Sequence, residues 1–172
     1  MSITIRGEDA TCLFEILSDP KTIFIEGHTG AGKTTVGKKI AEKLGAKFFD
    51  TDSYVVKGSA SDVIKQYENM VDIEKLSKEL MEEKGKKVIV GICLRKILKL
   101  PKILEGAIFI YIKCVSRTLD QWIEESILED LREGIEDINY IPEPHASDYR
   151  YILEFNPQYN ADIVFERLEE NI

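Results

Sequence analysis

The residues of this chain that are best suited to chemistry stand together in its first third. Residues 27–34 read Gly-His-Thr-Gly-Ala-Gly-Lys-Thr, a full match to the pattern G-x-x-x-x-G-K-[S/T]. Glycine permits the backbone curvature that aims several N–H groups at one anion, and a helix that starts after such a loop adds the positive end of its dipole. The spacing therefore predicts a loop that binds the phosphate groups of a nucleotide.

Each position of this loop has an expected role. The glycines let the loop wrap the β-phosphate, Lys33 reaches the β- and γ-oxygens, and the Thr34 hydroxyl completes a Mg²⁺ shell. We expect the His28 side chain to face solvent and to take no part in catalysis. The other interpretation is a glycine-rich turn that only connects a strand to a helix. The expected nucleotide contacts within the loop and the first helical turn are Gly27, His28, Thr29, Gly30, Ala31, Gly32, Lys33, Thr34 and Thr35.

Two carboxylates form a second candidate group. Asp50 and Asp52 follow the helix expected after the loop at the distance of a second strand tip. Residues i and i+2 of an extended segment point the same way, so both carboxylates are predicted to reach one site, with Asp50 on the Mg²⁺ side and Asp52 near an acceptor hydroxyl. A carboxylate there can take or orient the proton of a hydroxyl that attacks the γ-phosphorus. Alternatively, Asp50 caps a turn and Asp52 is the N-cap of the next segment.

From this pattern, the candidate catalytic residues are Lys33, Asp52 and Asp50, and the candidate metal ligands are Thr34 and Asp50.

The composition limits the alternatives. With 172 residues and 44% hydrophobic content, the chain is long enough for one core, and we expect residues 1–172 to form a single domain. The net charge of −8 argues against a nucleic-acid partner, because such binding depends on clustered Lys and Arg. No apolar run reaches the roughly eighteen residues that cross a membrane, and Cys12, Cys93 and Cys114 lack the spacing of a zinc or disulfide site. These features predict a cytoplasmic protein with no membrane partner.

Strands and helices must position these groups. We expect strands at residues 22–26, 47–50, 88–90, 107–112 and 163–165, and helices at 10–17, 33–44, 61–84 (one broken helix or two) and 116–138. This alternation predicts an α/β three-layer P-loop NTPase fold with a mostly parallel sheet of about five strands. Ligands of such sheets bind at the carboxyl ends of the strands. The Pro-containing stretch 139–147 is expected to be a loop at the rim of the site.

The residues around the loop also resemble a known family. The run from Ile23 to Tyr54, with T-V-G-K-K-I-A-E-K-L-G-A-K-F-F-D-T-D, resembles the shikimate-kinase and gluconate-kinase branch of small P-loop kinases, and the tail from Tyr149 to Phe165 is similar to the closing segment of uridine-kinase-type enzymes. Together these resemblances imply a nucleoside-monophosphate-kinase-like fold that uses ATP and Mg²⁺. They imply transfer of the γ-phosphoryl group to a hydroxyl of a small metabolite, a nucleoside or a sugar-like compound, with Asp52 as the acceptor-binding base and Asp50 as the Mg²⁺-side carboxylate.

The chain departs from the family pattern on the acceptor side. Shikimate kinases clamp an acidic substrate with arginines and carry a glycine triplet after the third strand. Here no arginine stands between Arg6 and Arg95, and the third strand is followed by a single glycine, Gly91. These departures argue against shikimate as the acceptor.

The expected lid, residues 116–147, is rich in acids and poor in arginine. Arg117 is the expected nucleotide contact from this segment, and Arg95, Lys113 and Arg132 are further candidates. The acids indicate either a solvated outer helix face or an acidic docking surface. Two other functions therefore stay open: a nucleotide-binding regulatory protein that has lost transfer, and a slow NTP hydrolase. The acids from which this interpretation is drawn are Asp120, Glu124, Glu125, Glu129, Asp130, Glu133, Glu136 and Asp137.

Overall fold

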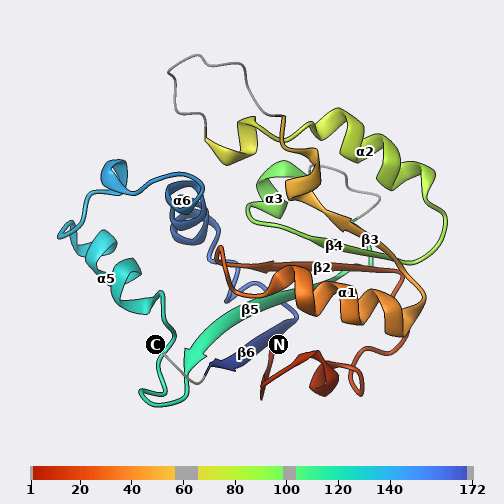
Figure 1. Ribbon diagram of the computed structural model, residues 1–172, viewed down its shortest axis with the longest axis horizontal. Helices are drawn as coiled ribbons and strands as arrows, with labels where there is room; N and C mark the ends of the chain where they lie inside the picture. The colour runs from red at the N-terminus through yellow and green to blue at the C-terminus, as the bar shows by residue number, and fades with distance from the viewer. Residues whose placement is uncertain (1, 57–65, 99–103, 170–172) are drawn as a thin grey trace.

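A parallel six-stranded sheet forms the centre of the molecule (Figure 1). The computed structural model describes residues 2–56, 66–98 and 104–169, and within them the strand order is β1-β6-β5-β2-β4-β3, with every pairing parallel. This confirms the predicted three-layer α/β fold with one strand more than expected. The strands are β1 (Ile3–Gly7), β2 (Thr22–Gly27), β3 (Lys47–Asp50), β4 (Lys87–Val90), β5 (Ile108–Ser116) and β6 (Ile163–Glu169).

The additional strand is β1, at the edge of the sheet. It pairs only with β6 and is largely exposed, so its sequence lacks the continuous apolar run that marked the inner strands. The sequence analysis therefore missed it.

Helices cover both faces of the sheet. They are α1 (Lys33–Leu44), α2 (Ile73–Glu82), α3 (Leu94–Ile97), α5 (Glu125–Glu133) and α6 (His145–Phe155), with short 3-10 helices η1 (Ala10–Leu13), η2 (Thr51–Tyr54), η3 (Tyr67–Asn69) and η4 (Ile138–Tyr140). Helix α1 agrees with its predicted bounds. It buries Val36 and Ile40 and ends at Gly45, whose backbone adopts a left-handed conformation, the usual way in which glycine terminates a helix.

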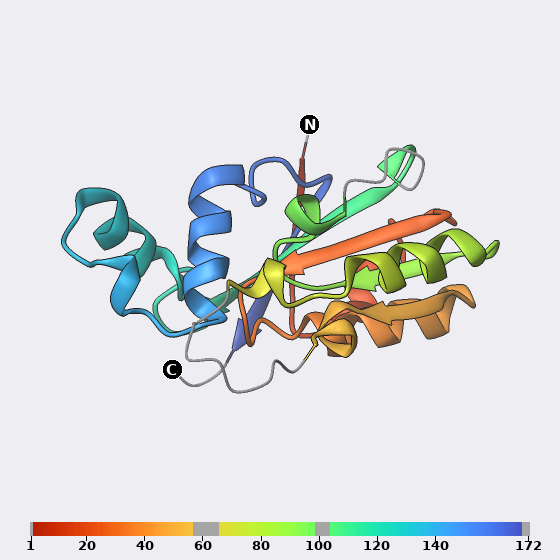
Figure 2. The same cartoon turned by 90° about the horizontal axis from the view of Figure 1, so that it is seen from above.

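Alternation along β2 separates the two halves of the core. Ile23 and Ile25 face α1 and pack in one buried cluster, whereas Phe24 lies in the cluster on the other face with residues of α2, α3 and α6. Every residue of β2 is buried, as expected for a strand covered on both sides. Figure 2 shows this layered arrangement from above.

The predicted helix at 116–138 is wrong at its start. Strand β5 continues to Ser116, and an antiparallel bridge joins Val115 to Trp122 before α5 begins. The reason is long-range pairing: Lys113 to Ser116 lie in register with β6 from Glu166 to Glu169. These inter-strand hydrogen bonds carry β5 beyond its predicted end at residue 112 and place Ser116 in the strand, while the bridge to Trp122 precedes the helix.

Two other helical predictions also need correction. In place of the helix at 10–17 there is only η1, capped by the Asp9 carboxylate, followed by turns. In the predicted segment 61–84, residues 61–65 lie outside the described residues. The rest forms η3 and α2, and the Asp72 side chain caps α2 by accepting from the Lys75 N–H.

The rim segment 139–147 is shorter as a loop than predicted, because α6 starts at His145 directly after Pro144. Figures 1 and 2 show α5 and α6 beside the end of the sheet toward which β2 points. Helix α6 therefore stands next to the residues that follow β2. Among the helices that the structure describes, none is long and apolar enough to cross a membrane.

Candidate nucleotide and acceptor site

The loop between β2 and α1 has a backbone that only glycine permits at two positions. A β-carbon on Gly27 would come within 2.6 Å of the Ile112 carbonyl oxygen. Gly32 has a φ of +88°, and a β-carbon there would lie 3.1 Å from Arg167 Nε. Because the loop leads directly into α1, the free N–H groups at the start of that helix face the loop, as an anion site requires.

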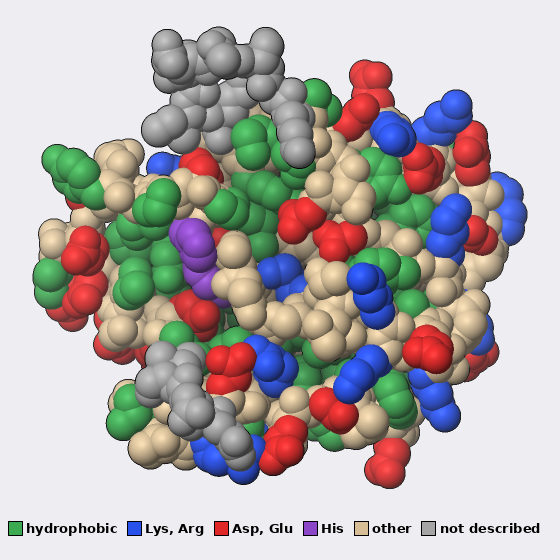
Figure 3. All heavy atoms as spheres, viewed as in Figure 1, with side chains coloured by type: hydrophobic (Ala, Val, Ile, Leu, Met, Phe, Trp, Pro, Cys, Tyr) green, Lys and Arg blue, Asp and Glu red, His purple; other side chains and the backbone are tan. Residues whose placement is uncertain are grey.

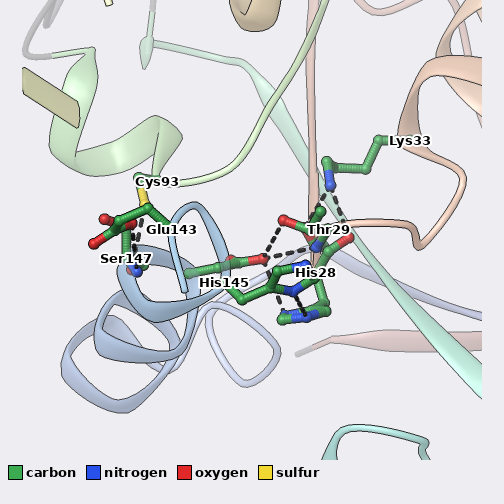
Figure 4. Close-up of polar contacts among 9 residues, drawn as sticks. His28, Thr29, Lys33, Cys93, Glu143, His145 and Ser147 are labelled. Atoms are coloured by element: carbon green, nitrogen blue, oxygen red, sulfur yellow. Dashed lines mark hydrogen bonds and ion pairs between the residues drawn. The ribbon is translucent and has the colours of Figure 1, made fainter. Parts of the chain in front are cut away.

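Lys33 is held inside this loop by two main-chain carbonyls. Its Nζ donates to Gly27 O and to His28 O, each at 2.8 Å, and Figure 4 shows the ammonium turned toward His28 and Thr29. Burial lowers the pKa of Lys33, and the negative charges of the nearby carboxylates, Asp148 foremost, oppose that shift. The ammonium is thus fixed within the loop by these two carbonyls.

The two predicted carboxylates do lie at one cavity, although the local geometry differs from that expected. Asp50 ends β3, while Asp52 lies within η2 and not on an extended segment. Asp50 Oδ2 accepts from the Thr34 hydroxyl at 2.9 Å, and its Oδ1 accepts from the Asp52 N–H at 3.1 Å. Asp50 therefore caps a turn and also accepts a hydrogen bond from Thr34, the other predicted metal ligand.

A cavity of about 250 Å³ connects the loop to these carboxylates. It is lined by Thr29, Gly30, Gly32, Lys33, Thr34, Thr35, Asp50, Asp52, Tyr67, Val90, Gly91, Ile92 and Pro144. The loop and the start of α1 thus line one part of the cavity, and the two carboxylates and Tyr67 line another part. Pro144 closes the cavity from the end of the segment that was expected to be a lid.

Tyr67 is a site residue that sequence reasoning missed. Its hydroxyl donates to Asp52 Oδ1 at 2.5 Å and lies 2.9 Å from Thr51 Oγ1. Burial and the Asp52 carboxylate raise the pKa of Tyr67, so the phenol stays a hydrogen-bond donor at neutral pH. The sequence around Tyr67 contains no catalytic or binding motif, so no local pattern indicated this residue.

The expectation that His28 faces solvent is wrong. The side chain is 5% exposed, and its ring lies against that of Tyr149, with centroids 4.6 Å apart and the planes tilted by 31°. His28 Nε2 lies 3.1 Å from His145 Nδ1, and His28 Nδ1 lies 3.0 Å from Asp148 Oδ2, although without the alignment of a hydrogen bond. In the space-filling view, histidine forms a small surface patch beside acidic side chains (Figure 3).

The arginine that contacts the loop is Arg167, whereas Arg117 was expected. Arg117 pairs with Glu8 at 2.5 Å and is not among the residues that line the cavity. Arg167, on β6, donates from Nε to Ala31 O at 3.0 Å. Two of the other basic candidates are engaged elsewhere: Arg95 pairs with Glu26 at 3.0 Å, and Lys113 lies over the Trp122 ring. The third, Arg132, is exposed on α5 and is not among the residues that line the cavity.

Comparison with known proteins identifies the family. The family model described as shikimate kinase matches residues 29–126, more than half of the chain. The chain belongs to the shikimate kinase family. The match takes in most of the loop, both carboxylates and the strands β3, β4 and β5, and it confirms the resemblance to small P-loop kinases that the sequence pattern indicated.

Individual members of the shikimate kinase family match over shorter stretches. A shikimate kinase from Actinobacillus succinogenes is 36% identical over 47 residues, covering 27% of each chain. Shikimate kinase 1 from Erwinia tasmaniensis is 33% identical over 75 residues, 40% of this chain and 43% of the relative. The chain therefore matches less than half of the length of these curated relatives.

Structural comparison supports the fold over a larger region. A possible uridine kinase from Bacillus stearothermophilus superposes with a TM-score of 0.52 over 88% of this chain and 94% of that chain, at 12% identity. This likeness shows a shared fold. It covers a larger share of the chain than the family match over residues 29–126.

Proposed function

We propose that this member of the shikimate kinase family transfers the γ-phosphoryl group of ATP to a hydroxyl of a small, neutral metabolite such as a nucleoside or a sugar-like compound. One observation carries the proposal: the phosphate loop with Lys33 and the carboxylates Asp50 and Asp52 line the same cavity. Donor and acceptor groups can therefore meet without water between them, which is the main requirement of phosphoryl transfer. The family assignment supports the reaction class.

In the proposed reaction, the acceptor oxygen forms a bond to the γ-phosphorus while the bond from that phosphorus to the β,γ-bridging oxygen breaks and ADP leaves. Asp52 orients the acceptor hydroxyl and takes its proton. Tyr67 occupies Oδ1 of this carboxylate, which leaves Oδ2 for the acceptor. Lys33 and the loop amides stabilise the charge that develops on the phosphoryl oxygens.

The residues present fit Mg²⁺. Thr34 Oγ1 and Asp50 Oδ2 are two hard oxygen ligands 2.9 Å apart at the start of α1, and Mg²⁺ at nucleotide sites is typically held by one or two protein oxygens together with phosphate oxygens and water. We propose Thr34 and Asp50 as its protein ligands. When bound, the ion would neutralise charge on the β- and γ-phosphates.

The charges at the cavity support a neutral acceptor. The described charged residues that line it are Lys33, Asp50 and Asp52, and none of the six arginines, all of which lie in the described part of the chain, is among the lining residues. A carboxylate placed next to two aspartates without a guanidinium partner would be repelled. Shikimate carries such a carboxylate, so we propose a different acceptor even though the relatives are shikimate kinases.

We further propose that residues 1–172 act as one domain in which the segment 116–147 closes over the nucleotide. Its acids are mostly exposed, apart from buried Glu124 and half-buried Asp130 and Glu143. This exposure supports the solvated-face interpretation of the acidic segment. Pro144, at the end of the segment, already lines the cavity.

The decisive experiment measures ADP release from ATP with Mg²⁺ across a panel of acceptors. We expect neutral ribonucleosides or polyols to stimulate release and shikimate to leave it unchanged. Stimulation by shikimate would show a kinase with a different acceptor class from the one proposed. Release that ignores every acceptor would indicate a hydrolase, and calorimetric ATP binding without release would indicate a regulatory protein.

A further inference from the structure

The first turn of α6 reaches the phosphate loop through a buried carboxylate. Asp148 is 2% exposed, and its Oδ2 accepts from the Thr29 N–H at 2.8 Å and lies 3.4 Å from the Thr29 hydroxyl. The same oxygen is 3.0 Å from His28 Nδ1. A buried carboxylate is costly unless its oxygens are bound, so this contact fixes the distance between α6 and the loop.

The Asp148 contact falls on the same peptide group that holds Lys33. Asp148 binds the N–H of Thr29, and Lys33 binds the C=O of His28 at 2.8 Å, which are the two polar ends of the peptide bond between those residues. That bond is planar and trans, so its N–H and C=O point in opposite directions and turn together. A rotation that releases Asp148 must also swing the carbonyl away from Lys33.

We propose that Asp148 is a positioning residue for the phosphate site, which acts through the His28–Thr29 peptide to hold the Lys33 ammonium at the centre of the loop. This proposal rests on the nucleotide binding proposed above. It assigns a role in the site to a residue of α6, which lies outside the residues 29–126 that the family match covers. Neighbouring contacts fix Asp148 itself, since Ser147 Oγ accepts from the Tyr67 N–H at 3.0 Å and the Ser147 N–H donates to Glu143 at 3.1 Å.

Figure 4 shows that the polar contacts of the first turn of α6 form two groups. Lys33, His28, Thr29 and His145 gather on the side of the loop, while Cys93, Glu143 and Ser147 lie together on the other side. The first turn of α6 is therefore fixed from two directions. A carboxylate on such a rigid support can hold a peptide orientation better than one on a free loop.

The test is a double-mutant cycle read by the affinity for a fluorescent ATP analogue, with Asp148→Ala, Lys33→Met and the double variant. If Asp148 acts through Lys33, D148A weakens binding about tenfold in the native background, the scale of one charge-assisted hydrogen bond. In the K33M background the same change should alter binding less than about twofold. An equal loss in both backgrounds would mean that Asp148 acts independently of Lys33 and would overturn the proposal.

Two conservative variants distinguish the effect of the position of the Asp148 oxygens from the effect of their charge, and neither depends on D148A. Asp148→Asn keeps an oxygen that can accept from the Thr29 N–H, so its affinity should stay within about threefold of the native value. Asp148→Glu keeps the charge but moves the oxygens by one methylene, so its loss should approach that of D148A. The reverse order, with D148E near native and D148N weak, would show that charge matters and the geometry does not.

A second readout covers the case in which K33M binds too weakly to titrate. Lys33 serves the β- and γ-phosphates, so in D148A or D148E the ratio of ATP to AMP affinity should fall about tenfold. An equal loss for both nucleotides would indicate general damage to the loop and would contradict the positioning role.

A matched control uses another carboxylate that accepts from a main-chain N–H. Asp162 binds the Phe109 N–H at 2.8 Å where β5 begins, at the opposite end of the sheet. Asp162→Ala should leave ATP affinity unchanged. If native protein bound no ATP, the proposed function itself would fail, whereas native binding that D148A, D148E and D148N all leave intact would refute only the role of Asp148.

Discussion

Asp148 and Lys33 bind opposite ends of one peptide group, the bond between His28 and Thr29. The two side chains come from α6 and α1, which lie on opposite faces of the sheet and have little other contact. This shared peptide group connects Lys33, the residue proposed to bind the phosphates, to a helix near the far end of the chain.

Replacing Lys33 should abolish most catalysis. Lys33→Met removes the ammonium that two carbonyls hold in the loop, and the loss of one such electrostatic contact costs about 10²–10³ in kcat. Acceptor-dependent ADP release measures the effect. Lys38→Met, an exposed change on the same helix, is the control and should stay near native; turnover of K33M within tenfold of native would contradict the assigned role.

Replacing Asp52 should affect turnover far more than ATP binding. Asp52→Asn cannot take the proton of the acceptor, and loss of a general base lowers kcat about 10²–10⁴-fold. Since Asp52 lies on the acceptor wall of the cavity, the KM for ATP should change little. Steady-state kinetics on the stimulating acceptor separates the two constants. Asp137→Asn, at an exposed cap of η4, is the comparison, and near-normal turnover of D52N would remove Asp52 from the mechanism.

Arg167 should contribute to nucleotide affinity. Arg167→Gln removes the guanidinium that donates to Ala31 O, and with it both a support and a positive charge beside the loop. We expect ATP binding to weaken about three- to tenfold, the scale of one hydrogen bond from a charged group. Arg6→Gln removes an arginine that instead pairs with Asp120 and Glu166 at 2.6 and 2.8 Å and should have no effect. Equal affinities for R167Q and native protein would refute the prediction.

Gly37 should tolerate no side chain. A β-carbon there would lie 2.4 Å from Val90 Cγ1 and 2.9 Å from Phe48 Cε2, because α1 packs tightly on β3 and β4. Overpacking of this kind costs about 1–3 kcal/mol, so Gly37→Ala should lower the free energy of unfolding measured in urea. The exposed change Glu42→Ala on the same helix should shift it by less than about 0.5 kcal/mol. A more stable G37A protein would show that the helix can move away from the sheet.

The stability should depend on pH through His145. Burial and the neighbouring His28 lower the pKa of His145 below its usual 6.5, while Asp148 opposes the shift. Below pH 6.5 the unfolded chain takes up this proton before the folded chain does, so stability is fully present above that pH and falls as the pH drops through the folded pKa.

Urea unfolding at pH 7.5, 6.5 and 5.5 should therefore show a loss on acidification that is smaller in His145→Gln. For a single group the difference in slope cannot exceed about 1.4 kcal/mol per pH unit. Asp148 lies against His28, and buried Glu124 is close to both residues. Because these groups can also contribute to the pH dependence, the difference between the native protein and His145→Gln isolates the contribution of His145. Identical slopes would show that His145 titrates normally.

Local sequence signals predicted the donor side of the site well. The glycine spacing, the apolar face of α1 and the stop at Gly45 depend on residues close in sequence, and the structure reproduces the predicted bounds of α1. The placement of Lys33, Thr34 and Asp50 at one cavity followed from the same signals. Asp52 reached the predicted cavity by a different backbone path, a 3-10 turn in place of an extended segment.

The misses at His28, Arg167 and β5 involve partners that are distant in sequence. His28 is buried because α6 brings His145, Asp148 and Tyr149 against it, and nothing in the loop sequence indicates that contact. Arg167 reaches the loop only because β6 pairs with β5 in a particular register, Cys114 opposite Arg167. The same pairing extended β5 beyond its predicted end, to Ser116. Register and helix docking are tertiary properties, which a local pattern does not encode.

Strand β2 is bonded on both edges, to β4 and to β5, and buried along its whole length. Amides in such a position exchange with solvent only when the molecule opens globally. The loop thus begins at the end of a strand whose amides we expect to be among the slowest to exchange. A bound nucleotide should therefore slow deuterium exchange at the amides of β4 and β5 as strongly as at those of the loop itself. Local opening of α5 and of the edge strand β1 would leave the binding site intact.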